Sequence, residues 1–192
     1  MIPTCGRPRT IWLVTPEWYG QGGVGDYTHY LACHLAALGC AVTVFGPPLC
    51  RPHTALHSQL PYSCREVARA WSPLALMRLV RLVRTERPDV LHLQFVPHGF
   101  QPRGLPTALC LLPLTLRLGG ASRPAVTFHE LFVPWEGGIV QRALGLLQRL
   151  QALLLAVPAC GIVVTLDQRA SWLGRWLPYK RSAIYIAPAG SN

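Results

Sequence analysis

A run of glycines marks the first stretch of the chain that could do chemistry. Four glycines fall within residues 20–25, between an apolar segment at residues 10–15 and an amphipathic segment at residues 26–38. Glycine lets backbone amides approach a ligand closely, and a helix that begins just after them adds the positive end of its dipole. A loop of this kind favours an anion, most often a phosphate.

Two common phosphate motifs fit this loop only in part. Residues 20–25 match the dinucleotide fingerprint G-x-G-x-x-G, but no acidic residue that could bind a ribose occurs between Asp26 and Glu66. The same glycines have the spacing of a P-loop, but Asp26-Tyr27 stands where that motif needs a lysine and a hydroxyl. A nucleotide-cofactor oxidoreductase stays open as an alternative, with Arg51 as the partner of a 2′-phosphate.

The elements that must position these residues alternate along the chain. Strand candidates lie at residues 10–15, 41–45, 64–71, 89–95, 125–128, 161–165 and 183–186. Helix candidates lie between them at residues 26–38, 72–86, 105–118 (strained by Pro113), 139–157 and 167–177. This alternation predicts an α/β fold, namely a doubly wound, mostly parallel Rossmann-like sheet with helices on both faces.

Polar residues gather where three of the predicted strands end. They occupy residues 17–25, 94–100 and 129–138. In doubly wound sheets, ligands bind outside the carboxyl ends of the strands, at the point where the strand order reverses. We therefore expect these three segments to converge on one site.

Two further segments carry arginine or histidine at suggestive spacings. Three arginines recur at intervals of three within residues 78–84. They indicate a solvated basic face on a sheet-covering helix, which we favour, or a helix that lies on a membrane surface. His53 and His57 are four residues apart, but the proline-rich sequence around them predicts an exposed loop rather than a metal site.

The amino-acid composition limits the number of domains and the kinds of partner that we expect. The 192 residues suit one domain, and the 51% hydrophobic and 14% charged residues suit a sheet that is covered on both faces. The formal net charge is +10, and every basic residue except Lys180 is arginine. A basic surface attracts anionic lipid or substrate. Because the basic residues are scattered and form no nucleic-acid-binding motif, we expect no nucleic-acid partner.

The cysteines and apolar runs indicate a cytoplasmic protein. Seven cysteines include no C-x-x-C pair, so we expect neither a metal cluster nor a disulfide framework. The apolar run at residues 150–166 is broken by Pro158 and Gly161, and it reads as a helix end, a turn and a buried strand rather than a membrane span. Peripheral contact with the inner membrane face stays open.

Four segments together resemble one enzyme family. They are residues 22–28 (GGVGDYT), 87–94 (RPDVLHLQ), 127–130 (TFHE) and 186–192 (IAPAGSN). In this order they resemble the N-terminal, acceptor-side domain of GT-B glycosyltransferases of the family 4 type. The resemblance extends from about residue 11 to the end of the chain.

The resemblance implies transfer of a sugar from a nucleotide-sugar donor to a glycan or glycolipid acceptor, usually with retention of anomeric configuration. The nucleotide sugar is then a co-substrate, and no cofactor or metal is implied. Gly22, Gly23 and Val24 would lie near the donor phosphate or the transferred sugar. His129 would contact the donor sugar near the reacting carbon, with Glu130 beside it as a second catalytic candidate. The acceptor-side candidates, by position, are Tyr19, Tyr27, Gln94, His98 and Trp135.

The family's second domain, which holds the nucleotide, is not part of residues 1–192, which we read as a single truncated GT-B half. Turnover is therefore expected to need that domain or a partner subunit. Two alternatives stay open beside the oxidoreductase. One is a non-catalytic module that binds glycan, lipid or a partner protein. The other is a hydrolase that uses two carboxylates from among Glu17, Glu130 and Glu136.

Overall fold

The computed structural model describes residues 9–48, 60–67, 71–132 and 138–188. The segment with His53 and His57 lies outside the described residues, and so do Arg51, Trp135 and Glu136. Within the described part, no helix is long and apolar enough to cross a membrane.

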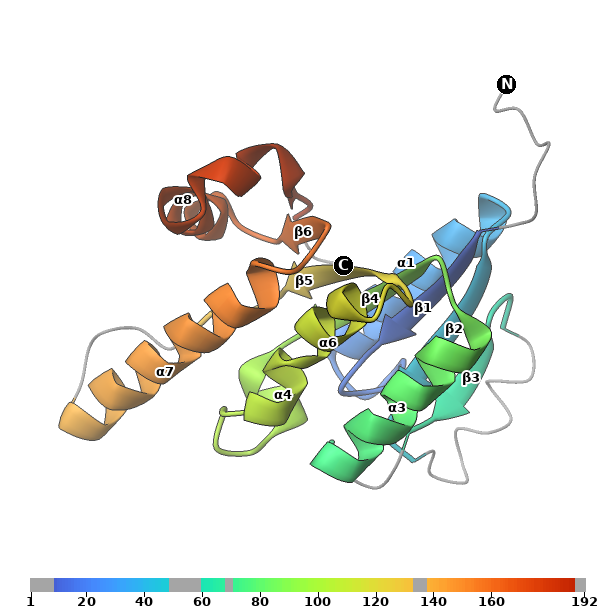
Figure 1. The fold of residues 1–192 in the computed structure, drawn as a ribbon, viewed down its shortest axis with the longest axis horizontal. Coiled ribbons are helices and arrows are strands. Elements are labelled where there is room, and N and C mark those ends of the chain that lie inside the picture. Colours follow the sequence, from blue (N-terminus) through green and yellow to red (C-terminus); the bar gives the residue numbers. More distant parts are fainter. Residues whose placement is uncertain (1–8, 49–59, 68–70, 133–137, 189–192) are drawn as a thin grey trace.

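All seven strands pair in parallel, in the order β3-β2-β1-β4-β5-β6-β7 (Figure 1). The strands are β1 Thr10–Val14, β2 Ala41–Gly46, β3 Ser63–Glu66, β4 Val90–Phe95, β5 Arg123–Phe128, β6 Gly161–Val164 and β7 Ile184–Ile186. The sheet confirms the predicted doubly wound α/β class, and it is parallel throughout.

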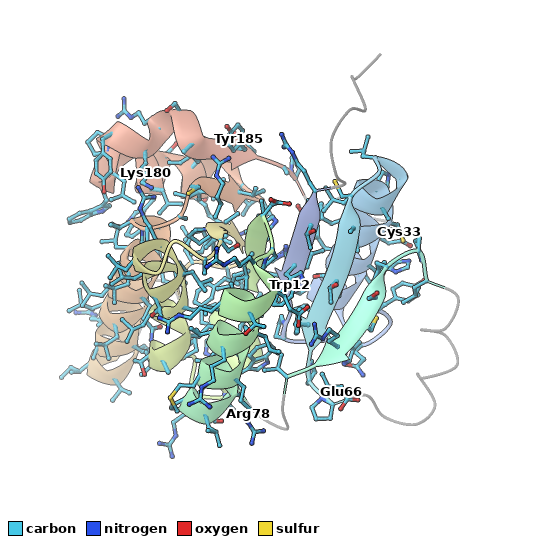
Figure 2. The ribbon with its side chains drawn as sticks, turned by 45° about the vertical axis from the view of Figure 1, so that its right-hand side comes forward. Trp12, Cys33, Glu66, Arg78, Lys180 and Tyr185 are labelled. Carbon is cyan, nitrogen blue, oxygen red and sulfur yellow. The ribbon has the colours of Figure 1, made fainter. Side chains whose placement is uncertain are left out.

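Helices cover both faces of this sheet. They are α1 Gly23–Ala37, α3 Pro73–Glu86, α4 Pro97–Phe100, α5 Thr107–Cys110, α6 Leu112–Leu118, α7 Ile139–Ala156, α8 Asp167–Trp176 and the 3-10 helix η2 Pro178–Ala183. The alternation of side chains along β1 separates the two layers. Ile11 and Leu13 pack with α1 in one core, whereas Trp12 and Val14 pack with α3, α6, α7 and α8 in the larger core (Figure 2).

Most predicted elements agree with the structure to within two residues, and three differ by more than that or are divided. The predicted helix 105–118 is two helices, α5 and α6, because Pro113 lacks an N–H and its ring excludes the preceding helical turn. Of the strand predicted at residues 64–71, the structure shows β3, which begins at Ser63 and ends at Glu66, while residues 68–70 lie outside the described residues. Helix α1 begins at Gly23, three residues earlier than predicted, so that part of the glycine run belongs to its first turn.

Each glycine of this run has its own structural role. Gly20 has a φ of 78°, a left-handed conformation that other residues rarely adopt. A Cβ on Gly25 would lie only 2.1 Å from the backbone oxygen of Trp18, whereas a Cβ on Gly23 would have no atom within 4 Å. Close packing of α1 against the loop before it therefore needs glycine at position 25 and not at position 23.

This contrast predicts opposite outcomes for two alanine substitutions on the same helix. Gly25→Ala should destabilise the fold by about 1–3 kcal/mol, because the obstructing atom is backbone and cannot rotate away. Gly23→Ala should change stability by less than about 0.5 kcal/mol, or raise it slightly, because alanine restricts the unfolded chain. Urea unfolding of both variants measures the difference, and equal stabilities would contradict the packing described here.

Candidate functional site

The strand order reverses between β1 and β4, and the loops that follow these two strands meet. Parallel pairing runs from Ile11 opposite Val90 to Val14 opposite Leu93. Beyond the paired residues, a Cβ on Gly99 would lie 3.0 Å from the ring of Pro16, so the two loops are in close contact. This edge of the sheet is where doubly wound folds bind their ligands.

Glu17 occupies the start of α1, where we expected an external anion. Its carboxylate accepts hydrogen bonds from the amides of Val24 (2.9 Å) and Gly25 (3.1 Å). A Cβ on Gly22 would lie 2.5 Å from the same carboxylate. Helix α1 has no side-chain cap from the residue before it, so Glu17 provides the negative charge that its N-terminus favours. Of the predicted phosphate-binding residues, only Gly23 is exposed and unobstructed.

His129, Gln94 and Tyr27 form a cluster on the α1 side of the sheet. His129 Nε2 lies 3.0 Å from Gln94 Oε1, and the ring of Tyr27 meets the imidazole edge-on with centroids 4.7 Å apart. Because a carboxamide oxygen only accepts, Nε2 carries the proton and Nδ1 is an acceptor in this arrangement. Gln94 is fully buried, and its Nε2 has no hydrogen-bond partner among the residues that the structure describes. The cluster thus contains an acceptor, His129 Nδ1, and a buried donor, Gln94 Nε2.

Burial keeps this histidine neutral. Burial, followed by the nearby positive charge of Arg169, lowers the pKa of His129 to about 4. On the same face, His92 Nε2 lies 2.7 Å from Thr127 Oγ1, and burial together with His129 lowers the pKa of His92 to about 4. Both imidazoles are therefore uncharged at neutral pH, because burial disfavours the charged form of a histidine.

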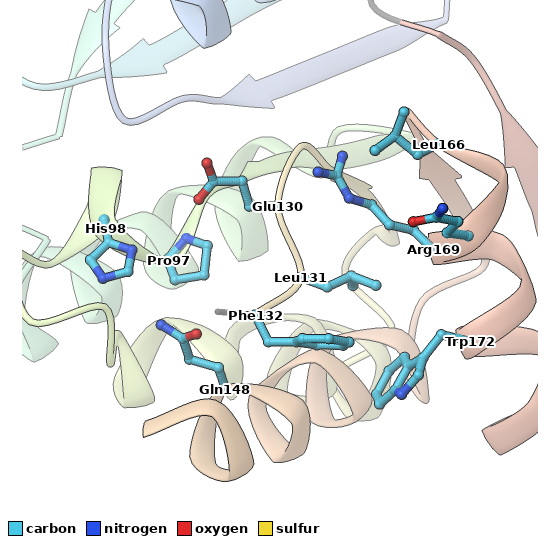
Figure 3. A pocket seen from close by; sticks show the side chains of 10 residues that line it. Pro97, His98, Glu130, Leu131, Phe132, Gln148, Leu166, Arg169 and Trp172 are labelled. Atoms are coloured by element: carbon cyan, nitrogen blue, oxygen red, sulfur yellow. The ribbon is translucent and has the colours of Figure 1, made fainter. Parts of the chain in front are cut away.

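A cavity of about 590 Å³ opens at the carboxyl ends of β4, β5 and β6 (Figure 3). Its lining residues are Pro97, His98, Glu130, Leu131, Phe132, Gln148, Leu166, Gln168, Arg169 and Trp172. Figure 3 shows Glu130 and Arg169 on one side of the cavity and Phe132 and Trp172 on the other. The cavity combines an acidic and a basic side chain with two aromatic rings.

Several of these side chains are held in place by neighbours. The rings of Phe132 and Trp172 pack edge-on with centroids 4.9 Å apart, and the Arg149 guanidinium lies 3.9 Å from the Phe132 centroid. Gln148 is fully buried and donates from Nε2 to the Gly104 backbone oxygen at 3.1 Å. Arg169 donates to the hydroxyl of Thr165. The aromatic and polar walls are thus preorganised by contacts within the chain.

The predicted site residues fall into three groups. Tyr27, Gln94 and His129 form the cluster, while His98 and Glu130 line the cavity. Tyr19 lies apart from both groups, because its ring stacks on His29 with centroids 4.0 Å apart. Trp135 lies outside the described residues. The neighbours His129 and Glu130 therefore contribute to different parts of the edge.

Sequence reasoning missed Arg169, Trp172 and Gln148. A signal existed for Arg169, since it lies in the first turn of α8, the helix that follows the carboxyl end of β6. Trp172 lies one helical turn further on, at a spacing of three, and faces the same cavity. Gln148 sits in the middle of an apolar helix, and nothing in its local sequence shows that it reaches the site.

The parallel sheet, with helices on both faces and a cavity at its carboxyl edge, defines a Rossmann-like α/β domain. Residues 21–191 match the sequence profile of Glycosyltransferase Family 4, so the chain belongs to this family. The match confirms the resemblance to a GT-B N-terminal domain. No curated protein matches the chain in sequence.

Solved structures share the fold at low sequence identity. A Listeria monocytogenes protein described as a UDP-N-acetylglucosamine 2-epimerase has a TM-score of 0.58 at 10% identity, over 92% of this chain and 44% of that chain. A Rickettsia africae glycosyltransferase has a TM-score of 0.57 at 12% identity, over 97% and 44%. BdcA from E. coli has a TM-score of 0.52 at 11% identity, over 93% and 96%. The chain spans under half the length of the first two proteins.

The two neutral histidines predict a pH-dependent stability. In the unfolded chain each has a pKa near its ordinary value of 6.5, and in the folded chain near 4. Protons therefore favour the unfolded state, so the contribution is complete above about pH 6.5 and is lost as the pH falls toward 4. Each histidine should add a slope of up to about 1.4 kcal/mol per pH unit within this window.

Urea unfolding between pH 7 and pH 4 measures this slope for the unaltered chain and for His129→Gln. The variant should lose stability less steeply on acidification, because one of the two neutral histidines is gone. Parallel curves for both proteins would contradict the assignment of His129 as a buried, uncharged group.

Proposed function

We propose that this domain binds the acceptor in a glycosyltransferase that moves a sugar from a nucleotide-sugar donor with retention of anomeric configuration. The family membership supports sugar transfer in general. The observation that carries the acceptor-side assignment is the cavity at the carboxyl edge, with Glu130 and Arg169 on one side and Phe132 and Trp172 on the other. Sugars suit such a cavity because their hydroxyls bind polar groups and their C–H faces pack on aromatic rings.

Charge argues that this cavity holds a sugar rather than a diphosphate. Among its lining residues, burial lowers the pKa of Arg169, and the negative charge of Glu130 acts on it in the opposite direction. A nucleoside diphosphate needs several cations or amides, and the amides of Val24 and Gly25 are already bonded to Glu17. We therefore propose that a second Rossmann-like domain, on the same polypeptide or on a partner, provides most of the donor site.

His129 is proposed to hold a hydroxyl of the donor sugar next to the reacting carbon. Its neutral imidazole has Nδ1 as an acceptor, while Nε2 is bonded to Gln94. The free N–H of Gln94 is proposed to donate to an oxygen of the same sugar. A buried donor without a partner costs about 1–3 kcal/mol, which a ligand oxygen recovers on binding.

The transfer proposed here requires no protein nucleophile. The bond between the anomeric carbon and the diphosphate oxygen breaks, and the acceptor oxygen forms the new bond on the same face of the sugar. The acceptor proton passes to the departing diphosphate. The chain's own contribution is to position the acceptor and to exclude water from the reacting centre.

The structure gives no reason to favour the oxidoreductase. That alternative rests on the glycines of residues 20–25 as a pyrophosphate cradle, and Glu17 fills the amides that a pyrophosphate would need. A non-catalytic glycan-binding module uses the same cavity, so it differs from the proposed enzyme only in turnover.

The described cysteines support a reducing compartment, and we propose a cytoplasmic location on that basis. Cys33, Cys40, Cys64, Cys110 and Cys160 are not joined in disulfides. Exposed and partly buried thiols persist where glutathione keeps them reduced.

The acceptor-side proposal predicts which acidic residue matters for glycan binding. Methyl glycosides of common hexoses, titrated into the purified chain and followed by saturation-transfer NMR, should bind weakly. Glu130→Gln should weaken binding about tenfold or more, because a hydrogen bond to a charged group is lost. Glu86→Gln is the matched control, since Glu86 is exposed and paired with Arg65 at 2.8 Å, away from the cavity.

Equal affinities for Glu130→Gln and Glu86→Gln would place sugar binding elsewhere and overturn the proposal. Adding UDP- and GDP-sugars separates the remaining outcomes. Glycan binding with sugar transfer supports the enzyme. Glycan binding without transfer supports either an enzyme that needs a second domain or a non-catalytic binding module. Binding of NADPH, seen by nicotinamide fluorescence, would revive the oxidoreductase.

A further inference from the structure

We propose that the outer surface of helices α3, α6 and α7 binds an anionic membrane surface peripherally. We call it the α3–α6–α7 surface. The three helices lie side by side over one face of the sheet, and their buried residues share the larger core (Figure 1). Its membrane binding is independent of sugar transfer, so either proposal can fail alone.

Apolar exposure is concentrated on this surface. Of the nineteen large apolar side chains that are exposed in the described residues, twelve belong to α3, α6, α7 and the residues that adjoin the ends of α6 and α7. Leu118 is 79% exposed and Ile139 is 87% exposed. Contiguous apolar exposure of this kind marks an interaction surface, whereas single exposed side chains do not.

On α7 the exposed residues form one stripe. Ile139, Leu146, Leu150 and Leu154 recur at intervals of seven and four, so they lie on one side of the helix. The buried residues, among them Ala152 and Leu155, occupy the opposite side. The helix is about 27 Å long at 1.5 Å per residue, and the stripe follows it from its first residue to its last turn.

The other two helices add apolar and basic side chains in the same outward direction. On α3, the buried residues include Leu79 and Val83, and the opposite side carries Met77 with arginines at positions 78, 81 and 84. Figure 2 shows Arg78 pointing away from the sheet. A groove of about 410 Å³ between α3 and α6 is lined by Met77, Arg81, Arg84 and Leu111. Apolar and basic groups are thus interleaved.

The positive charge of the α3–α6–α7 surface indicates which kind of partner it binds. Helices α3, α5, α6 and α7 together carry six arginines, of which Arg117 bonds to the Pro158 backbone oxygen and Arg149 packs on Phe132. Their one acidic residue, Glu86, pairs with Arg65 outside these helices. Two copies of the chain would bring two such basic surfaces together, which disfavours a homodimer. Anionic headgroups match the arginines while the acyl boundary accepts the leucine side chains, and each cation near such a surface contributes about 1 kcal/mol.

The test is flotation of the purified chain with phosphatidylcholine vesicles that contain or lack phosphatidylglycerol. The chain should float with the anionic vesicles, less so as salt is raised. A triple variant with Arg78, Arg81 and Arg84 changed to Gln should bind about a hundredfold more weakly, since each arginine contributes about fivefold. Leu146→Gln with Leu150→Gln should also weaken binding, because apolar insertion is lost.

Two matched controls separate this surface from general charge. Changing Arg9, Arg123 and Arg175 to Gln lowers the net charge equally but lies outside the three helices, and it should leave binding within about twofold. Leu38→Gln, at an exposed position next to α1, should have no effect. Thermal unfolding of all variants checks that each is folded.

Three outcomes would overturn the proposal. They are absence of flotation, equal loss in both arginine triples, or a concentration-dependent dimer that is broken by Leu146→Gln with Leu150→Gln while lipid binding is unchanged. The first two remove the membrane role of this surface. The third assigns it to a second copy of the chain.

Discussion

The parallel pairing of β1 with β4 is the constraint on which the candidate site depends. It places the carboxyl ends of two strands side by side at the point where the helices change from one face to the other. The next pairing, of β4 with β5, aligns Gln94 with Thr127 and Phe95 with Phe128, so that His129 emerges beside Gln94. A shift of one residue in this register would move every one of these side chains to the opposite face.

Glu17 changes the interpretation of the glycine-rich loop. The loop is built for close packing and for an anion, but the anion is a side chain of the same protein. The same residues therefore stabilise the junction of β1 and α1 instead of presenting free amides. This leaves the cavity around Glu130 and Arg169 at the carboxyl edge, which we propose holds an acceptor sugar.

The fold followed from the sequence because its strands are apolar runs separated by amphipathic helices, and the strand ends located Gln94, His98, His129 and Glu130 correctly at one edge. The sequence could not show toward which part of this edge each side chain points. His129 and Glu130 are adjacent, yet one contacts Tyr27 and the other lines the cavity. Contacts between distant residues, such as Glu17 with Val24 or Gln148 with Gly104, depend on tertiary packing that local patterns do not encode. Pro113 indicated strain in the helix predicted at residues 105–118. Its position in the first turn of α6 accounts for the division of that helix into α5 and α6.

We propose that acceptor sugars bind at the carboxyl edge of β4, β5 and β6. The most direct test is the change in backbone amide NMR shifts when an acceptor glycoside is titrated into the isotope-labelled chain. Shifts are expected at residues 96–101, 129–132 and 166–172, with little change at residues 20–26. Shifts confined to residues 20–26, or centred on the amino ends of the strands, would contradict it.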